Sequence, residues 1–167
     1  LLLNAGYAAD QFSEPGTSSL AMAMLDEGTA KMDALEISDA AANIGAIIGS
    51  GSGVDNSTVS LNALKENLDQ SIKLYADIIL NPSFPKNELE RLRKQRLAQI
   101  QQEKNQPFGI ALRVLPKLLY GENHAYSMPL TGSGTEESIS KITQDSLIEF
   151  HKKWFKPNNA TMIIVGD

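Results

Sequence analysis

The sequence has 167 residues, of which 42% are hydrophobic and 21% are charged, a composition that suits one globular domain with a sizeable core. Its net charge of −5 argues against a nucleic-acid-binding surface, because phosphate binding needs a basic patch, and the lack of cysteine excludes disulfides and thiolate chemistry. No apolar run approaches the length of a membrane span. The chain opens on Leu1 without an initiator Met and stops where a strand is predicted to end, so we expect residues 1–167 to form a single domain taken from a longer polypeptide.

The spacing of apolar residues predicts strands and helices that alternate along the chain. In chain order we expect a strand at 1–8, helices at 17–26 and 38–44, strands at 46–53 and 58–64, helices at 67–80, 86–104, 107–119 and 144–155, and a final strand at 161–165. Asn67 or Asp69 and Thr143 are the predicted N-caps of two helices, and Pro116 is expected to kink the end of another. The final strand is β-branched and apolar, which predicts that at least one of its faces is buried.

The two middle strands flank a turn at Asp55 and Asn56, so they are expected to form an antiparallel hairpin. The run from Gly49 to Gly53 could also be a flexible linker, but strand-forming residues on both sides favour a strand. No Gly-rich phosphate loop follows a predicted strand. The sequence therefore predicts an α+β fold, with a mixed or antiparallel sheet and helices layered on one face.

Residue types that often carry chemistry are present, but not in catalytic patterns. His124 lies in a predicted loop and His151 on a predicted helix, and a single His is not a metal site, so structural roles are favoured for both. Ser18 and Ser19 lack the Gly-x-Ser-x-Gly elbow of a serine hydrolase. Methionines at helical spacing favour core packing over a soft-metal site, and here they are Met22, Met24 and Met32.

The most informative segment lies between Pro15 and Thr29, because it lacks the reactive residues of a motif whose surroundings it keeps. This segment reads Pro-Gly-Thr-Ser-Ser-Leu-Ala-Met-Ala-Met-Leu-Asp-Glu-Gly-Thr. It resembles the part of pitrilysin/insulinase family zinc peptidases that carries His-x-x-Glu-His shortly before a Gly-Thr pair. Counting back from Thr29, Ser19 and Ala23 take the places of the two His residues, and Met22 takes the place of the Glu. Zinc needs imidazole or carboxylate ligands and the general base needs a carboxylate, so none of the three can serve.

The resemblance to the pitrilysin/insulinase family runs nearly the whole length of the chain. Other segments similar to family motifs are Leu61–Leu64, Ile79–Phe84, Glu88–Gln102, Tyr120–Tyr126, Lys156–Thr161 and Ile164–Asp167. Single motifs are weak, but their order and spacing together are fairly specific. The family's third zinc ligand is a Glu at a set distance beyond the second His, and that count reaches Gln99 or Ile100, neither of which is acidic. The resemblance therefore leaves every zinc-ligand position empty, and we expect no metal and no catalytic residue in this chain.

The resemblance also implies an architecture and a set of partners. The family's half-repeat is a sheet of about six strands backed by helices, an α+β arrangement. Family peptidases consist of two homologous halves that enclose a chamber, and one half carries the zinc. We expect this chain to be a non-catalytic half that supplies chamber wall, partner interface and peptide-substrate contacts. The catalytic half, with its zinc, would lie on the same polypeptide or on a separate subunit.

Two alternatives to this interpretation stay open. One is a scaffold or processing-complex subunit of the same fold with no proteolytic role, and the other is an enzyme that uses residues outside the recognised motifs. For compartment, the periplasm is favoured over the cytoplasm, with any targeting segment outside this chain. Within the domain, we expect Met22 to be buried where helix 17–26 meets helix 86–104, while residues 49–53 and the open edge of the sheet face the partner.

Overall fold

The computed structural model describes residues 1–166, and the sheet has four strands in that range. They are β1 (Leu2–Leu3), β2 (Ile47–Ser52), β3 (Ser57–Asn62) and β4 (Ala160–Thr161). Their spatial order is β2-β3-β1-β4, and every neighbouring pair is antiparallel. The predicted hairpin is confirmed, because β2 and β3 pair from Ile47 opposite Asn62 to Ser52 opposite Ser57. The described residues hold fewer strands than the family resemblance implied.

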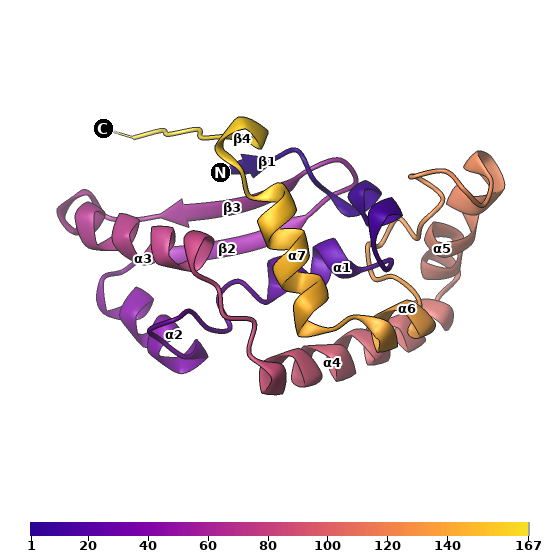
Figure 1. Ribbon diagram of the computed structural model, residues 1–167, viewed down its shortest axis with the longest axis horizontal. Helices are drawn as coiled ribbons and strands as arrows, with labels where there is room; N and C mark the ends of the chain where they lie inside the picture. The colour runs from indigo at the N-terminus through magenta and orange to yellow at the C-terminus, as the bar shows by residue number, and fades with distance from the viewer. Residues whose placement is uncertain (167) are drawn as a thin grey trace.

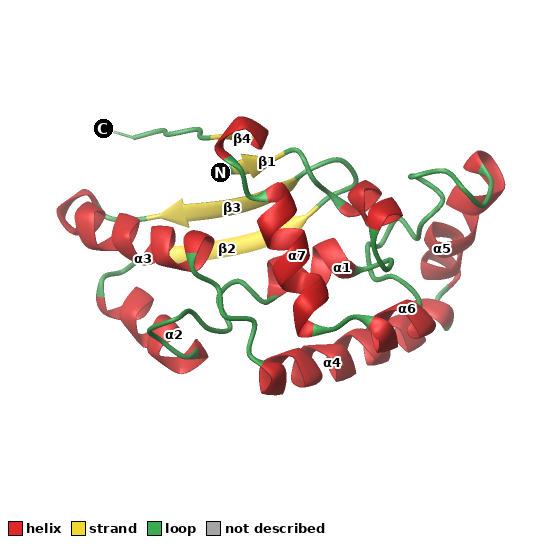
Figure 2. Ribbon diagram, in the orientation of Figure 1, coloured by secondary structure: helices red, strands yellow, loops and turns green. Residues whose placement is uncertain are grey.

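The helices lie beside this sheet and confirm the α+β prediction. They are α1 (Thr17–Ala23), α2 (Ala34–Asn43), α3 (Leu68–Leu80), α4 (Lys86–Lys104), α5 (Pro107–Tyr120), α6 (Glu136–Lys141) and α7 (Gln144–Trp154), with short 3-10 helices η1 (Tyr7–Phe12), η2 (Lys65–Asn67) and η3 (Pro157–Asn159). Figure 1 shows α7 crossing in front of the sheet and α4 running along the lower side of the molecule. Coloured by secondary structure, Figure 2 shows α3 and α7 passing in front of the ends of β2 and β3, with α2, α4 and α6 below the strands. Helix α1 contacts both β2 and α7, so it lies between the sheet and the outer helices.

The hydrophobic core forms where α1, α3, α4 and α7 meet the sheet. Its largest fully buried side chains are Leu3, Leu20, Met22, Met24, Leu25, Val59, Ile78, Phe84, Ile100, Ile139, Ile142 and Leu147. Four of these come from α1 and the two residues after it, so packing determines the residue types in that segment. The prediction that Met22 and Met24 are core residues is confirmed. Within the described part of the chain, no helix combines the length and apolar character that crossing a bilayer requires.

Local sequence signals predicted several helix ends correctly. Helix α4 has the predicted bounds, because Pro85 holds an extended φ, ψ pair just before its first residue. The predicted Thr143 cap is confirmed, since its Oγ1 accepts a hydrogen bond from the Ser146 N–H at 3.2 Å. Asn67 is the N-cap residue of α3, one of the two predicted, but its side chain makes no capping hydrogen bond. The Asn67 amide instead donates to the Ile44 carbonyl at 3.0 Å, and Asp69 lies inside the helix.

The two ends of the chain form less sheet than predicted. The expected first strand stops at Leu3, because the chain turns into η1 after Gly6, where a Cβ would lie 2.3 Å from the Gly53 carbonyl oxygen. The predicted burial of strand 161–165 is wrong, and residues 162–165 are 57% to 92% exposed. The register places Thr161 opposite Leu2, so residues beyond 162 have no described strand opposite them. Helix α6 was not predicted, and α5 continues through Pro116 to Tyr120.

Candidate functional site

Helix α1 carries three of the motif positions, and a buried carboxylate fixes its first turn. Asp10 is fully buried, and its Oδ2 accepts a hydrogen bond from the Gly16 N–H at 2.7 Å. Its Oδ1 accepts from the Ser18 N–H at 2.9 Å, and Oδ2 also accepts from the Ser18 hydroxyl at 3.2 Å. Gly16 has φ +97°, a conformation that favours glycine, and a Cβ there would lie 2.7 Å from Ile139 Cδ1. Asp10 therefore satisfies amide donors at the start of α1 and sets the direction of the helix.

Asp10 gives a prediction about pH. Burial raises the pKa of its carboxyl from 3.8 to about 7, opposed by hydrogen bonds from Ser18 and Gly16, which lower it. Because the folded-state pKa is the higher one, this group stabilises the fold most below about pH 4, and the contribution is lost as the pH rises to about 7. At about 1.36 kcal/mol per pKa unit, the loss is on the order of 4 kcal/mol.

Urea unfolding of the wild type and of Asp10→Asn between pH 4 and 8 measures this contribution. The free energy of unfolding of the wild type, minus that of the variant, should fall as the pH rises, because the Asn side chain stays neutral throughout. A difference that stays constant with pH would mean that Asp10 keeps the same protonation state in the folded and unfolded chain.

The structure places the four motif positions in different environments. Ser19 and Ala23, at i and i+4 on α1, share one helix face and are both partly buried. Met22 is fully buried in the core. Gln99 is exposed on α4, and its amide donates to Glu103 Oε1 at 2.9 Å. Among residues 1–166, no group of three or more His, Cys, Asp or Glu side chains is placed to hold a metal ion.

Met22 is buried as expected, in the same core cluster as Leu89 and Ile100 of α4, and its place between α1 and α4 stays a prediction. Helix α1 packs mainly on η1, β2 and α7, and the Ser50 hydroxyl of β2 donates to the Met22 carbonyl at 2.8 Å. Residues 130–134 cover α1 on another side. The Tyr7 hydroxyl donates to the Leu130 carbonyl at 2.7 Å, and a Cβ on Gly132 would lie 2.8 Å from Ser19 Oγ. This loop and the sheet therefore both lie against α1.

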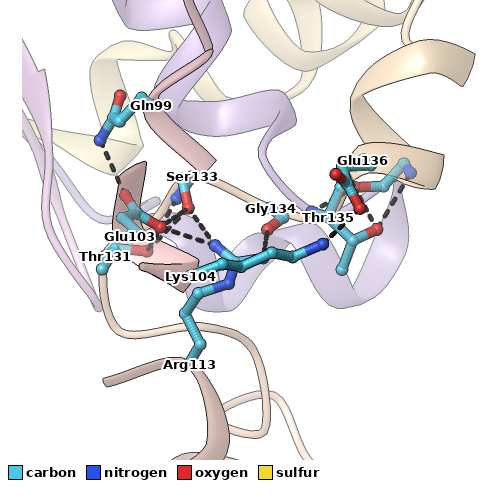
Figure 3. A network of polar contacts seen from close by, with 10 residues as sticks. Gln99, Glu103, Lys104, Arg113, Thr131, Ser133, Gly134, Thr135 and Glu136 are labelled. Carbon is cyan, nitrogen blue, oxygen red and sulfur yellow. Dashed lines mark hydrogen bonds and ion pairs between the residues drawn. The ribbon is translucent and has the colours of Figure 1, made fainter. Parts of the chain in front are cut away.

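A network of polar contacts joins the end of α4 to α5 and to the loop at 131–134 (Figure 3). Glu103 Oε2 accepts hydrogen bonds from Arg113 Nη1 at 2.7 Å, from Ser133 Oγ at 2.8 Å and from Thr131 Oγ1 at 3.2 Å. Arg113 Nη2 also donates to the Gly134 carbonyl at 2.7 Å. The paired side chains are only 10% and 12% exposed. Burial raises the pKa of Glu103, but the hydrogen bonds from Ser133 and Arg113 outweigh it and hold the pKa below its usual range. Glu103 is thus an ionised structural residue with its oxygens engaged.

Both histidines have structural contacts, as predicted. His151 Nε2 is hydrogen-bonded to the Ile79 carbonyl at 2.7 Å, and its ring stacks on Phe155 at a centroid distance of 4.3 Å. Burial lowers the pKa of His151, which favours the neutral ring at physiological pH. His124 stacks on Tyr120 at 5.1 Å. Ser18 lies in the first turn of α1 and donates both its N–H and its hydroxyl to Asp10, so it has a structural role.

Sequence reasoning missed three features of this region. Asp10 and the Glu103–Arg113 pair carry no local motif, because their partners lie 6 to 30 residues away in the chain. For Arg96, the sequence did indicate the partly buried position that the structure gives it. It lies four residues before Ile100 and seven before Glu103, and this spacing places a cation on the same helix face as a buried apolar residue.

Comparisons with known proteins identify the family of this chain. The family model described as insulinase (peptidase family M16) matches residues 1–131, and the model described as peptidase M16 inactive domain matches residues 141–167. A *Helicobacter pylori* protein named non-peptidase homolog YmxG is 25% identical over 100% of this chain and 38% of its own length. The crystal structure of a peptidase M16 inactive domain from *Pseudomonas fluorescens* is 34% identical with a TM-score of 0.84, over 90% of this chain and 36% of that one.

A third similar protein extends the comparison of folds. The crystal structure of the periplasmic protease PqqL from *Escherichia coli* has a TM-score of 0.77 at 17% identity, over 95% of this chain and 18% of that one. At that identity the likeness shows the fold alone. The chain spans less than two-fifths of the length of each of these three proteins.

Proposed function

Because this chain belongs to the insulinase family, peptidase family M16, and its last residues match the inactive-domain model of that family, we propose that it serves a zinc-bearing catalytic half without holding metal itself. In this role it contributes chamber wall, an interface with the catalytic half and a surface that contacts the peptide substrate. Zinc belongs to the catalytic half, which lies on the same polypeptide or on a separate subunit.

The observation that carries this proposal is the chemistry of the emptied motif. Ser19, Met22, Ala23 and Gln99 offer neither a set of zinc ligands nor a general base. Met22 at the Glu position is fully buried, where an unpaired carboxylate would be costly. In this proposal, the segment provides core packing where a catalytic half carries a reactive group. The inactive domain from *P. fluorescens*, at 34% identity, supports the same interpretation.

A second candidate function is a scaffold or processing-complex subunit of the same fold with no proteolytic role. The name of the *H. pylori* relative, a non-peptidase homolog that aligns with the whole chain, favours it. The two candidates differ in what a catalytic half would gain. Mixing the purified protein with a zinc-bearing M16 half from the same genome should raise peptide hydrolysis if the first proposal holds, and should leave hydrolysis unchanged for a scaffold.

We also propose that the protein acts in the periplasm. The fold that the chain shares with the periplasmic protease of Escherichia coli supports this proposal. Fractionation of cells that express the full-length protein, followed by immunoblotting, tests the compartment directly.

The first prediction of the proposed function is that the purified protein holds no stoichiometric zinc and cleaves no peptide. Elemental analysis by mass spectrometry after exhaustive dialysis measures the metal. Hydrolysis of a quenched fluorescent casein-derived peptide, with a zinc-bearing family peptidase as the positive control, measures activity. One tightly held zinc per chain, or hydrolysis that a chelator abolishes, would show that this half is catalytic.

A further inference from the structure

A cavity of about 340 Å³ lies between η1, with the two residues that follow it, and one face of α7. Phe12 and Glu14 line the cavity from the first segment, and Glu149, Lys153 and Trp154 line it from α7. Glu149 and Lys153 are one helical turn apart, so they lie on the same face of the helix. A volume of this size is near the lower limit for a small-molecule pocket, and it suits one long side chain.

Two aromatic rings in this cavity hold a cation. Lys153 Nζ lies 4.3 Å from the centroid of the Phe12 ring and 5.1 Å from the centroid of the Trp154 ring. Both distances are within the range of a cation–π contact. The two ring centroids are 6.4 Å apart, and Phe12 is 63% exposed. Phe12 and Trp154 therefore form a cation-binding surface that a ligand can reach from solvent.

The two carboxylates of the cavity have no cation of their own. Among residues 1–166, neither Glu14 nor Glu149 forms an ion pair. Glu149 lies four residues before Lys153, a spacing that favours an ion pair on a helix, yet the Lys153 ammonium lies on the rings. Lys141 is close enough to Glu14 for their charges to interact, but its ammonium pairs with Glu137 at 2.6 Å. With two Glu and one Lys in its lining, the cavity carries a net charge of −1, which attracts a further cation.

We propose that this cavity binds an arginine side chain of a peptide. A guanidinium stacks on aromatic faces and pairs with a carboxylate through two parallel hydrogen bonds. Phe12 and Trp154 supply the stacking surface, and Glu14 supplies the carboxylate. The guanidinium takes the place of the Lys153 ammonium on the rings, and the displaced ammonium pairs with Glu149, one turn earlier on α7. The inference rests on the proposed function, since the arginine belongs to the peptide that the non-catalytic half contacts.

Arginine fits this site better than lysine does. An ammonium is more strongly hydrated than a guanidinium and has no planar face to lie on a ring. Lys153 already brings an ammonium to the two rings without any cost of association, so an ammonium from outside gains little by replacing it. A guanidinium adds the stacking contact and a second hydrogen bond to Glu14.

Fluorescence anisotropy with three labelled peptides of Ala and Ser tests this proposal. The peptides are identical except at one central position, which holds Arg, Lys or citrulline, a neutral side chain of the same shape as Arg. The Arg peptide should bind about ten-fold more tightly than the citrulline peptide, as for one charge-assisted hydrogen-bonded pair, and more tightly than the Lys peptide. Equal binding of the Arg and citrulline peptides, equal binding of the Arg and Lys peptides, or no binding at millimolar concentration would overturn the proposal.

Variants of the cavity and matched controls outside it locate the binding site. Phe12→Ala should weaken binding of the Arg peptide by about five-fold or more, whereas Phe108→Ala, which removes a ring that is 75% exposed on α5, should leave it unchanged. Glu14→Gln should weaken binding about ten-fold, and Glu66→Gln, which removes the same charge from exposed η2, should not. If the control variants weaken binding as much as the cavity variants do, the site lies elsewhere and the proposal is wrong.

Lys153→Met separates this site from general electrostatics. The change removes the cation that competes for the two rings, so the Arg peptide should bind about two- to five-fold more tightly than to the wild type. Lys152→Met changes the net charge equally, but Lys152 is exposed and does not line the cavity, so the affinity should stay the same. An affinity that is unchanged or lower in Lys153→Met would contradict the proposed exchange of cations.

A failure of this inference is distinguishable from a failure of the proposed function. Tightly held zinc or peptide hydrolysis by the wild type would contradict the proposed function, whichever peptide binds. A protein without zinc or activity that does not prefer the Arg peptide would overturn only the assignment of the cavity.

Discussion

Met22→Asp is expected to lower the free energy of unfolding by about 3–5 kcal/mol, enough to unfold a domain of ordinary stability. The Met22 side chain is 0% exposed, and the contacts of α1 with β2 and α7 surround it with core residues such as Leu20 and Leu25. A carboxylate at this position would be buried without a cation to pair with it. Urea denaturation followed by circular dichroism at 222 nm gives the difference from the wild type.

Two controls identify the cause of this loss. Met22→Leu keeps the volume and the apolar character, so it should cost less than about 1.5 kcal/mol. Ala23→Asp introduces the same charge one residue later, on a partly exposed face, and should cost much less than Met22→Asp. If Met22→Asp leaves the midpoint unchanged, Met22 faces solvent, and the account of the emptied site as packed core is wrong.

This result bears on the proposal that Ser19, Met22 and Ala23 stand where a catalytic half has its zinc motif. Ser19 and Ala23 remain partly exposed, so polar or small residues suffice there. Position 22 differs, because Met22 is fully buried, and a carboxylate there would have no cation to offset the burial of its charge. Among these three positions of α1, we therefore expect the apolar side chain of Met22 to contribute most to the stability of the fold.

The sequence predicted the elements whose signals are local. Helix α4 follows Pro85 and ends at Lys104 as predicted, and Thr143 caps α7, because proline and N-cap side chains act on residues within one turn. The hairpin at β2 and β3 follows from the turn at Asp55 and Asn56. In each case the residues that decide the structure are neighbours in the chain.

The missed features depend on contacts between distant residues. Asn67 is a good cap by type, but the Ile44 carbonyl, 23 residues earlier in the chain, takes its amide. The last strand has a suitable apolar composition, but its partner β1 offers only Leu2 and Leu3 for pairing. The described strand β4 is therefore limited to Ala160 and Thr161. The motif frame located Ser19, Met22 and Ala23 on one helix but not the packing of that helix. Propensity gives no information on such pairings, which tertiary contacts decide.

The network at Glu103 is the most consequential of these distant contacts. It holds the loop at 131–134, whose Gly132 lies against Ser19, in place beside α1. Because the pKa of Glu103 is depressed in the folded state, its ionised form stabilises the fold at pH values above about 4.5, and the contribution is lost as the pH falls through the folded-state pKa. Its pH dependence is thus opposite in sign to that of Asp10, which loses its contribution as the pH rises.

Arg113→Met should therefore be the second strongly destabilising change, with a loss of about 3–5 kcal/mol at pH 7. The variant leaves Glu103 with its hydroxyl donors but without a cation, and Glu103 is only 12% exposed. The double variant Glu103→Gln/Arg113→Met should recover most of the loss, because no uncompensated charge remains. Arg91→Met, which breaks a pair whose Arg is 45% exposed, should cost less than about 1 kcal/mol.

Urea unfolding at pH 7 and pH 4 measures all three variants. The penalty of Arg113→Met should shrink at the lower pH, where Glu103 can take up a proton. A penalty that stays the same at both pH values, with no recovery in the double variant, would mean that Arg113 stabilises the loop through its contact with the Gly134 carbonyl and through packing rather than by compensating the buried charge.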